Sequence, residues 1–195
     1  MAAGARTQLV IEPYPSATPE VGLWLGGLQR IRQALLDTVE RIDAGGLSQE
    51  CIDWRGVTGD DNSVGSLLYH VAGIELDWLY ADLLMQEFPP DVLELFPYPV
   101  RDATGALQHV PGIALSEHVA RLHTSRARFL EVVSALDLAA WRRMREPAGV
   151  DYAVTPEWIV WHLTEHEAGH LYAIRGTVRK WLAQSSSGTN ATANR

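Results

Sequence analysis

The sequence predicts an all-α fold, a four-helix bundle with a long connection between its second and third helices. Three observations lead to this prediction. Apolar residues recur at helical spacing in four long segments, two of these segments open with the same start signal, and turn-forming residues lie between them. The expected helices span residues 18–43, 62–87, 115–136 and 156–182. Helices that rise about 1.5 Å per residue over such lengths can pack side by side around one core.

The first and fourth helices share their start signal. Thr18-Pro19-Glu20 and Thr155-Pro156-Glu157 each combine an N-cap hydroxyl, a proline at the first helical position and an acidic residue in the first turn. The first helix is expected to stop at Asp43-Ala44-Gly45-Gly46. Its apolar stripe consists of Trp24, Leu28, Ile31, Leu35 and Ile42, and that of the fourth helix of Val160, Leu163, Leu171, Ile174 and Val178.

The second and third helices are recognised by their stripes. The second begins near Asn62-Ser63 and ends before Pro89-Pro90, and the third begins near Ser116. Residues 88–114 between them contain five prolines, and a loop of this length is typically functional or contains a small hairpin. The two stripes are Leu67, Val71, Ile74, Trp78 and Leu79, and Leu115, Val119, Leu122, Phe129, Val133 and Leu136.

The chain is long enough for one domain, which we place at residues 18–183, after an extended N-terminal segment of residues 1–17. The polar residues 184–195 are predicted to be a disordered tail. Neither a signal peptide nor a run of about 20 apolar residues is found, and the one cysteine, Cys51, cannot form an internal disulfide. We therefore expect a soluble cytoplasmic protein without a membrane partner. Its net charge of −8 argues against nucleic-acid binding.

Three histidines recur every four residues on the fourth helix: His162, His166 and His170. Residues four apart share a helix face, so His166 and His170 can direct their imidazoles at one ion. At about 100° per residue these two lie at the border of the apolar stripe, whereas His162 lies further out. Imidazoles at the edge of a core need partners. A metal ion would supply one, and hydrogen bonds across the bundle are the alternative.

A third ligand is expected from another helix. His70 is the best candidate because it shares a face with the apolar stripe of the second helix. His109 lies in the long connection, and His118 and His123 fall off the stripe of the third helix, where we expect them to be exposed. Three histidines would leave a coordination position open, which is typical of catalytic sites, and imidazole ligands favour Zn, Ni, Cu or Fe.

A rival interpretation comes from the segment His166–His170, which reads as the H-E-x-x-H signature of zinc proteases. Those enzymes take a further ligand downstream, but neither His, Asp nor Glu follows His170. Glu167, the general base in that interpretation, also falls within the apolar stripe of the helix. The protease interpretation is therefore disfavoured.

Two charged residues are weak candidates for catalysis. Arg126 occupies a position of the third helix where the spacing expects an apolar residue. It could hold an anionic group of a substrate, or its stem could pack while its guanidinium reaches solvent. Glu167 could orient a ligand imidazole or act as a base, or it could pair with Arg126 or another arginine. Cys51 has no evident base beside it and is not expected to be a nucleophile.

The two histidine segments, Asn62–Glu75 and Trp161–His170, resemble those of the DinB-like superfamily of bacterial four-helix metalloproteins. This superfamily includes bacillithiol transferases and the related mycothiol-dependent maleylpyruvate isomerases. The resemblance covers roughly residues 18–183, with the histidine-bearing helices second and fourth. One departure is Gly169, since many relatives have a bulky polar residue or a second histidine just before the last ligand.

The resemblance implies that His70, His166 and His170 bind Zn or Ni. It also implies a possible homodimer, since members of the superfamily are frequently homodimers. It also implies a function: a metal-dependent S-transferase that uses a low-molecular-weight thiol and acts on small electrophiles. Two alternatives stay open, a hydrolase that uses a metal-bound water and a non-catalytic stress-related protein with a structural metal.

Overall fold

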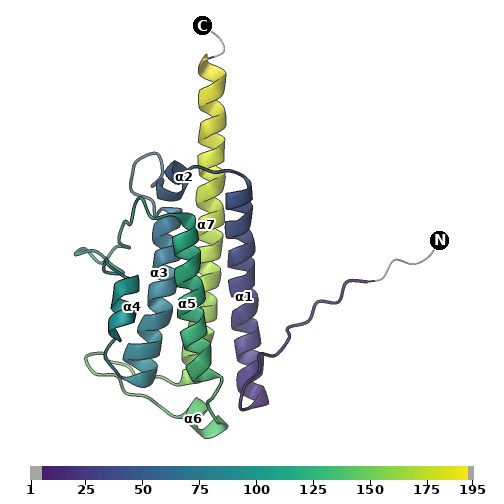
Figure 1. The fold of residues 1–195 in the computed structure, drawn as a ribbon, viewed down its shortest axis with the longest axis vertical. Helices are drawn as coiled ribbons and strands as arrows, with labels where there is room; N and C mark the ends of the chain where they lie inside the picture. Colours follow the sequence, from purple (N-terminus) through teal and green to yellow (C-terminus); the bar gives the residue numbers. More distant parts are fainter. Residues whose placement is uncertain (1–5, 193–195) are drawn as a thin grey trace, which may run out of the picture.

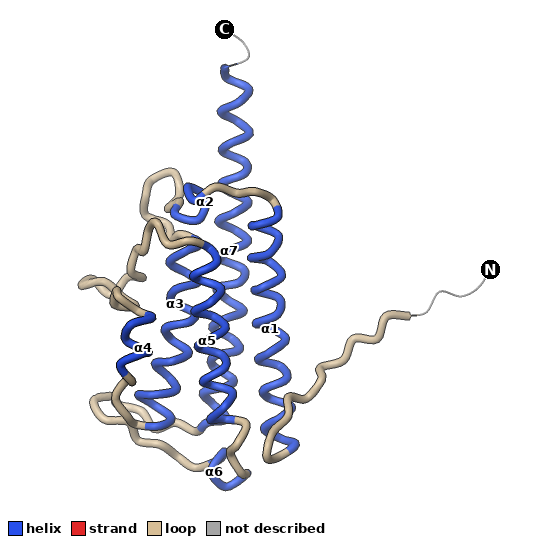
Figure 2. Tube along the Cα trace, in the orientation of Figure 1, coloured by secondary structure: helices blue, strands red, loops and turns tan. Residues whose placement is uncertain are grey.

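Four long helical stretches lie side by side in the computed structural model, which describes residues 6–192, with side chains to residue 186 (Figure 1). They are α1 (Pro19–Ala44), α3 (Val64–Asp77) continued by the π-helix η1 (Trp78–Leu84), α5 (Leu115–Val133) and α7 (Pro156–Thr192). No strand occurs among the described residues, which contain only two isolated β-bridges (Figure 2). The predicted all-α fold is therefore confirmed.

Three short helices lie in the connections: α2 (Gln49–Asp53), α4 (Pro90–Leu95) and α6 (Leu138–Arg142). None was predicted, because a helix of one or two turns is too short to display a periodic stripe. The connection between η1 and α5 contains α4 and then a turn closed by the bridge between Arg101 and Leu107.

The interior is filled by apolar side chains of the four long helices, among them many members of the predicted stripes, although Trp24 and Ile31 of the first stripe are only half-buried. α1 packs most extensively on α7, and α3 on α5. One apolar cluster surrounds Leu25, Phe129 and Ile159, and a second surrounds Leu35 and Ile174, all of them fully buried. Burying such side chains is the main favourable term in folding, so we expect the bundle to fold on these contacts without any ion.

The start of α1 differs from the prediction in its capping. The Thr18 side chain makes no cap hydrogen bond, whereas the Thr155 hydroxyl accepts one from the backbone N–H of Trp158 at 3.2 Å. The preceding chain lies against the first turns of α1 instead. An added Cβ would stand only 2.6 Å from the Tyr14 carbonyl oxygen at Gly22, so glycine is needed for this close approach.

The C-terminal helix is longer than predicted. α7 continues to Thr192 and passes beyond the ends of the other helices, although the sequence predicted an end at residue 182 and disorder from 184 (Figure 1). Extending an existing helix needs no new nucleus, so even small polar residues can continue it. Residues 193–195 of the predicted tail lie outside the described residues. No described helix is both long enough and apolar enough to cross a bilayer.

Candidate metal centre

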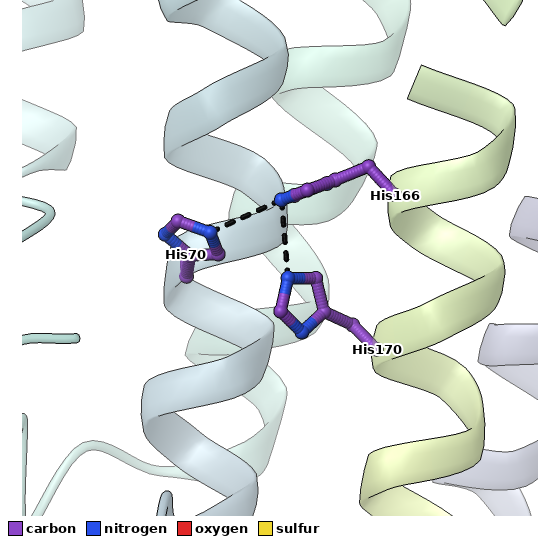
Figure 3. Close-up of side chains that lie close together, drawn as sticks. All are labelled: His70, His166 and His170. Carbon is purple, nitrogen blue, oxygen red and sulfur yellow. Dashed lines mark hydrogen bonds between the residues drawn. The ribbon is translucent and has the colours of Figure 1, made fainter. Parts of the chain in front are cut away.

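His70 on α3 and His166 and His170 on α7 point toward one another (Figure 3). The Nε2 atom of His166 lies 3.0 Å from that of His70 and 3.1 Å from that of His170. Ligand atoms of all three side chains lie within 4.8 Å of one another. The structure thus brings together the three histidines that the sequence singled out, from segments about a hundred residues apart.

The arrangement fits a tetrahedral ion. Nitrogen ligands bind zinc at about 2.0–2.1 Å, which places neighbouring ligand nitrogens about 3.3 Å apart. The two separations from His166, 3.0 and 3.1 Å, differ from this by only a few tenths of an ångström, and His70 and His170 offer ligand atoms within 4.8 Å of each other. Hydrogen bonds alone satisfy the three nitrogens less well, since the Nε2 of neutral His166 faces two others but carries at most one proton.

Burial keeps these imidazoles neutral. It is the main cause that lowers the pKa of His70 and of His166 to about 3, and it also lowers the pKa of His170. The positive charge of Arg101, in the long connection, lowers the pKa of all three further. At pH 7 each therefore has the protonation state that binds a metal. Sequence reasoning missed Arg101, because nothing local links residue 101 to α3 or α7.

His162, the remaining histidine of α7, takes a different position. Its ring stacks on Trp158 at 5.0 Å between centroids and 9° between planes, and it lies 5.0 Å from Trp78 and 5.8 Å from His166. Trp78 and Trp158 also line a pocket of about 530 Å³ together with Tyr152. The His162 ring thus contacts two tryptophans of the aromatic pocket and neighbours one histidine of the cluster.

A buried network of ion pairs joins one residue from each long helix: Arg32 on α1, Glu75 on α3, Arg126 on α5 and Glu167 on α7. Glu167 accepts hydrogen bonds from Arg32 Nε at 2.5 Å and from Arg126 Nη2 at 2.6 Å. Both arginines also bond Glu75, which accepts a further bond from the Ser125 hydroxyl at 2.6 Å. The two positive and two negative charges balance, as buried charges must.

This network revises the interpretation of the two catalytic candidates. Arg126 is 4% exposed, so the expectation that its head reaches solvent was wrong, and the anionic groups it holds belong to the chain itself. For Glu167 the structure shows the alternative in which it pairs with arginine. No described hydrogen bond joins its carboxylate to the histidine cluster. Burial alone would raise the pKa of Glu75, but the charges of Arg126 and Arg32 outweigh burial and lower it.

His118 contradicts the prediction of exposure, because it is fully buried on α5. Its Nε2 approaches Gly65 of α3, where an added Cβ would lie only 3.1 Å away. Neither ring nitrogen has a hydrogen-bond partner among the described residues, and burial is the main cause that lowers its pKa to about 4.

We expect His118→Leu to reduce the loss of stability in acid. The unfolded histidine binds a proton near pH 6.5 and the folded one only near pH 4. Between these values the unfolded state holds more protons, so the free energy of unfolding decreases as the pH is lowered. At pH 4.5 this term amounts to roughly 2–3 kcal/mol. Urea unfolding with a chelator present, at pH 7 and pH 4.5, measures it. An equal effect of His123→Leu, at an exposed position of the same helix, would contradict the assignment.

Cys51 lies in α2 rather than in a loop, and it is buried. Burial raises the pKa of its thiol to about 11, so the thiol stays protonated at neutral pH. This agrees with the expectation that Cys51 is not a nucleophile.

Comparison with known families identifies the fold. The family model of the DinB superfamily matches residues 27–174, which include the three clustered histidines. The chain belongs to the DinB superfamily. Members of this superfamily generally bind a metal ion, and the histidine cluster is a possible site for one in this DinB chain. No curated protein matches the chain.

Proposed function

We propose that this member of the DinB superfamily is a metal-dependent S-transferase that joins a low-molecular-weight thiol to a small electrophile. His70, His166 and His170 would hold Zn²⁺ or Ni²⁺. The observation that supports this most directly is the convergence of three neutral imidazoles to which no other described His, Cys, Asp or Glu adds a fourth ligand. Such a set leaves a position for an exogenous ligand, as catalytic zinc sites do.

The chemistry needs an activated sulfur. A divalent ion held by the three histidines would lower the pKa of a thiol bound to it. Sulfur then forms a bond to the electrophilic carbon while the bond to the leaving group breaks, and the thiol proton passes to solvent. Arg101 contributes a positive charge within electrostatic reach of the cluster, and this charge favours a thiol that carries a carboxylate.

The aromatic pocket suits the other substrate. Its volume of about 530 Å³ lies in the range of small-molecule sites, and Trp78, Tyr152 and Trp158 offer apolar ring surface. The His162 ring neighbours Trp78 and Trp158 of this pocket as well as His166. The apolar part of an electrophile could therefore occupy the pocket with its reactive carbon directed toward the histidine cluster.

A thiol-conjugation assay tests the proposal. Protein purified without a His-tag is analysed for metal, then incubated with monochlorobimane and, in turn, cysteine, N-acetylcysteine and glutathione. We expect conjugation that requires the metal and falls at least about 100-fold in His170→Ala, while the exposed-site control His123→Ala retains the wild-type rate.

Conjugation at the same rate with and without metal would contradict the S-transferase proposal. Metal-dependent cleavage of a p-nitrophenyl ester without any thiol would replace it with the hydrolase alternative.

A further inference from the structure

The groove between the C-terminal half of α1 and α7 carries three arginines: Arg41 on α1, and Arg175 and Arg179 on α7. Its volume is about 610 Å³, and none of its lining residues is acidic, although the chain has a net charge of −8. Among the described residues none of the three arginines forms an ion pair. No other described cavity is lined by three arginines without an acidic residue. This groove is therefore a concentration of positive charge that the chain itself leaves unneutralised.

Two of the guanidinium groups converge on one neutral atom. Arg175 donates to the Thr38 hydroxyl oxygen from Nε and Nη2, each at 3.1 Å, and Arg41 donates to the same oxygen from Nη2 at 3.3 Å. The Thr38 hydroxyl itself donates a hydrogen bond to the Ala34 carbonyl oxygen, at 2.9 Å. Guanidinium groups bind carboxylates and phosphates far better than a hydroxyl, and like charges held together repel. Their arrangement is that of a prepared anion site.

The electrostatic field at a helix end stabilises only one of these three arginines. Arg41 lies in the last turn of α1, where the carbonyl end of the helix favours a cation. Arg175 and Arg179 lie in the interior of α7, where no helix end stabilises their positive charge. The Arg175 guanidinium is also positioned from the side, since it lies 5.9 Å from the centre of the exposed Tyr172 ring.

Four further lining residues have apolar side chains: Ile42, Leu47, Val178 and Leu182. Leu182 is 46% exposed, so apolar surface of the groove is open to solvent. The groove thus combines three arginines with four apolar side chains, and its volume is in the range of small-molecule sites. A second copy of this acidic chain is a poorer match in overall charge.

We propose that this groove binds a small amphiphilic anion, with its carboxylate or phosphate head on Arg41, Arg175 and Arg179 and its hydrocarbon body on the apolar side chains of the groove. The site is distinct from the histidine cluster, because the groove lies between α1 and α7 whereas the cluster joins α3 to α7. Binding there needs no metal, so the proposal stands or falls separately from the proposed function.

Calorimetric titrations of the full chain, with chelator present, test the proposal. The probes are octanoate, octyl phosphate, inorganic phosphate and octyltrimethylammonium. We expect octanoate or octyl phosphate to bind more tightly than inorganic phosphate, and the cation not to bind. The stronger of the two octyl probes identifies the head group as carboxylate or phosphate.

The double variant Arg175→Gln, Arg179→Gln should weaken binding about tenfold or more, since charge-assisted hydrogen bonds to the head are lost. Arg30→Gln removes the same charge from an exposed position of α1 outside the groove and should leave binding unchanged. Equal affinities of the two variants, or equal binding of anionic and cationic octyl probes, would overturn the proposal. So would sedimentation showing that the groove mediates a dimer that the double variant abolishes.

Discussion

Replacing Glu167 with alanine is expected to lower the free energy of unfolding by about 3–5 kcal/mol, because the change leaves Arg32 and Arg126 buried with one carboxylate between them. This is a large part of the stability of a typical domain. For a chain of this length it corresponds to a fall in melting temperature of roughly 6–20 °C. Urea and thermal unfolding followed by circular dichroism, with chelator present, measure the change apart from any effect on metal binding.

The matched control is Glu20→Ala, which breaks the exposed ion pair with Arg142, 2.6 Å long. Exposed pairs contribute about 0–1 kcal/mol, so this variant should resemble the wild type. A Glu167→Leu, Arg126→Met double variant should lose less than the two single variants added together, because their charges belong to one network. Equal effects of Glu167→Ala and Glu20→Ala would show that the network does not contribute as described.

Metal binding gives the other large expected effect. His166→Ala should reduce bound metal from one ion per chain to a trace, because the Nε2 of His166 lies between those of His70 and His170. Helicity should be retained, since the apolar clusters hold the bundle together without an ion. The stabilisation by metal should be lost with the ion, roughly 3–4 kcal/mol at a hundred to a thousand times its Kd. Elemental analysis and melts with and without chelator test both expectations.

His123→Ala is the control, and it should bind and melt like the wild type. One ion per chain still bound to His166→Ala would refute the assignment of the ligands. Outright unfolding of the wild type on chelation at room temperature would mean that the ion is structural, because binding energy at such a site is folding energy.

The long helices were predictable because each displays a repeating apolar stripe, and a stripe must face a core wherever the chain folds. α1, α5 and α7 begin within about one residue of the predicted positions. Helix ends were less predictable. The second helix changes at Trp78 into a π-helix and ends at Met85, which has a φ of 51°. The apolar pattern predicts neither change. The short helices α2 and α6 lack the length for a stripe.

The sequence by itself determined that His166 and His170 share a helix face and that His70 lies on the face of an apolar stripe. This follows from helical geometry, which is local. Only the tertiary structure decided which helices are neighbours. It placed α3 beside α7, so that His70 meets the pair on α7, and it joined Arg32, Glu75, Arg126 and Glu167 into one network. It also buried His118 against Gly65. A charged or polar residue on an inner face has no local signal that names its partner, since the partner lies on another helix and its distance depends on how the helices pack.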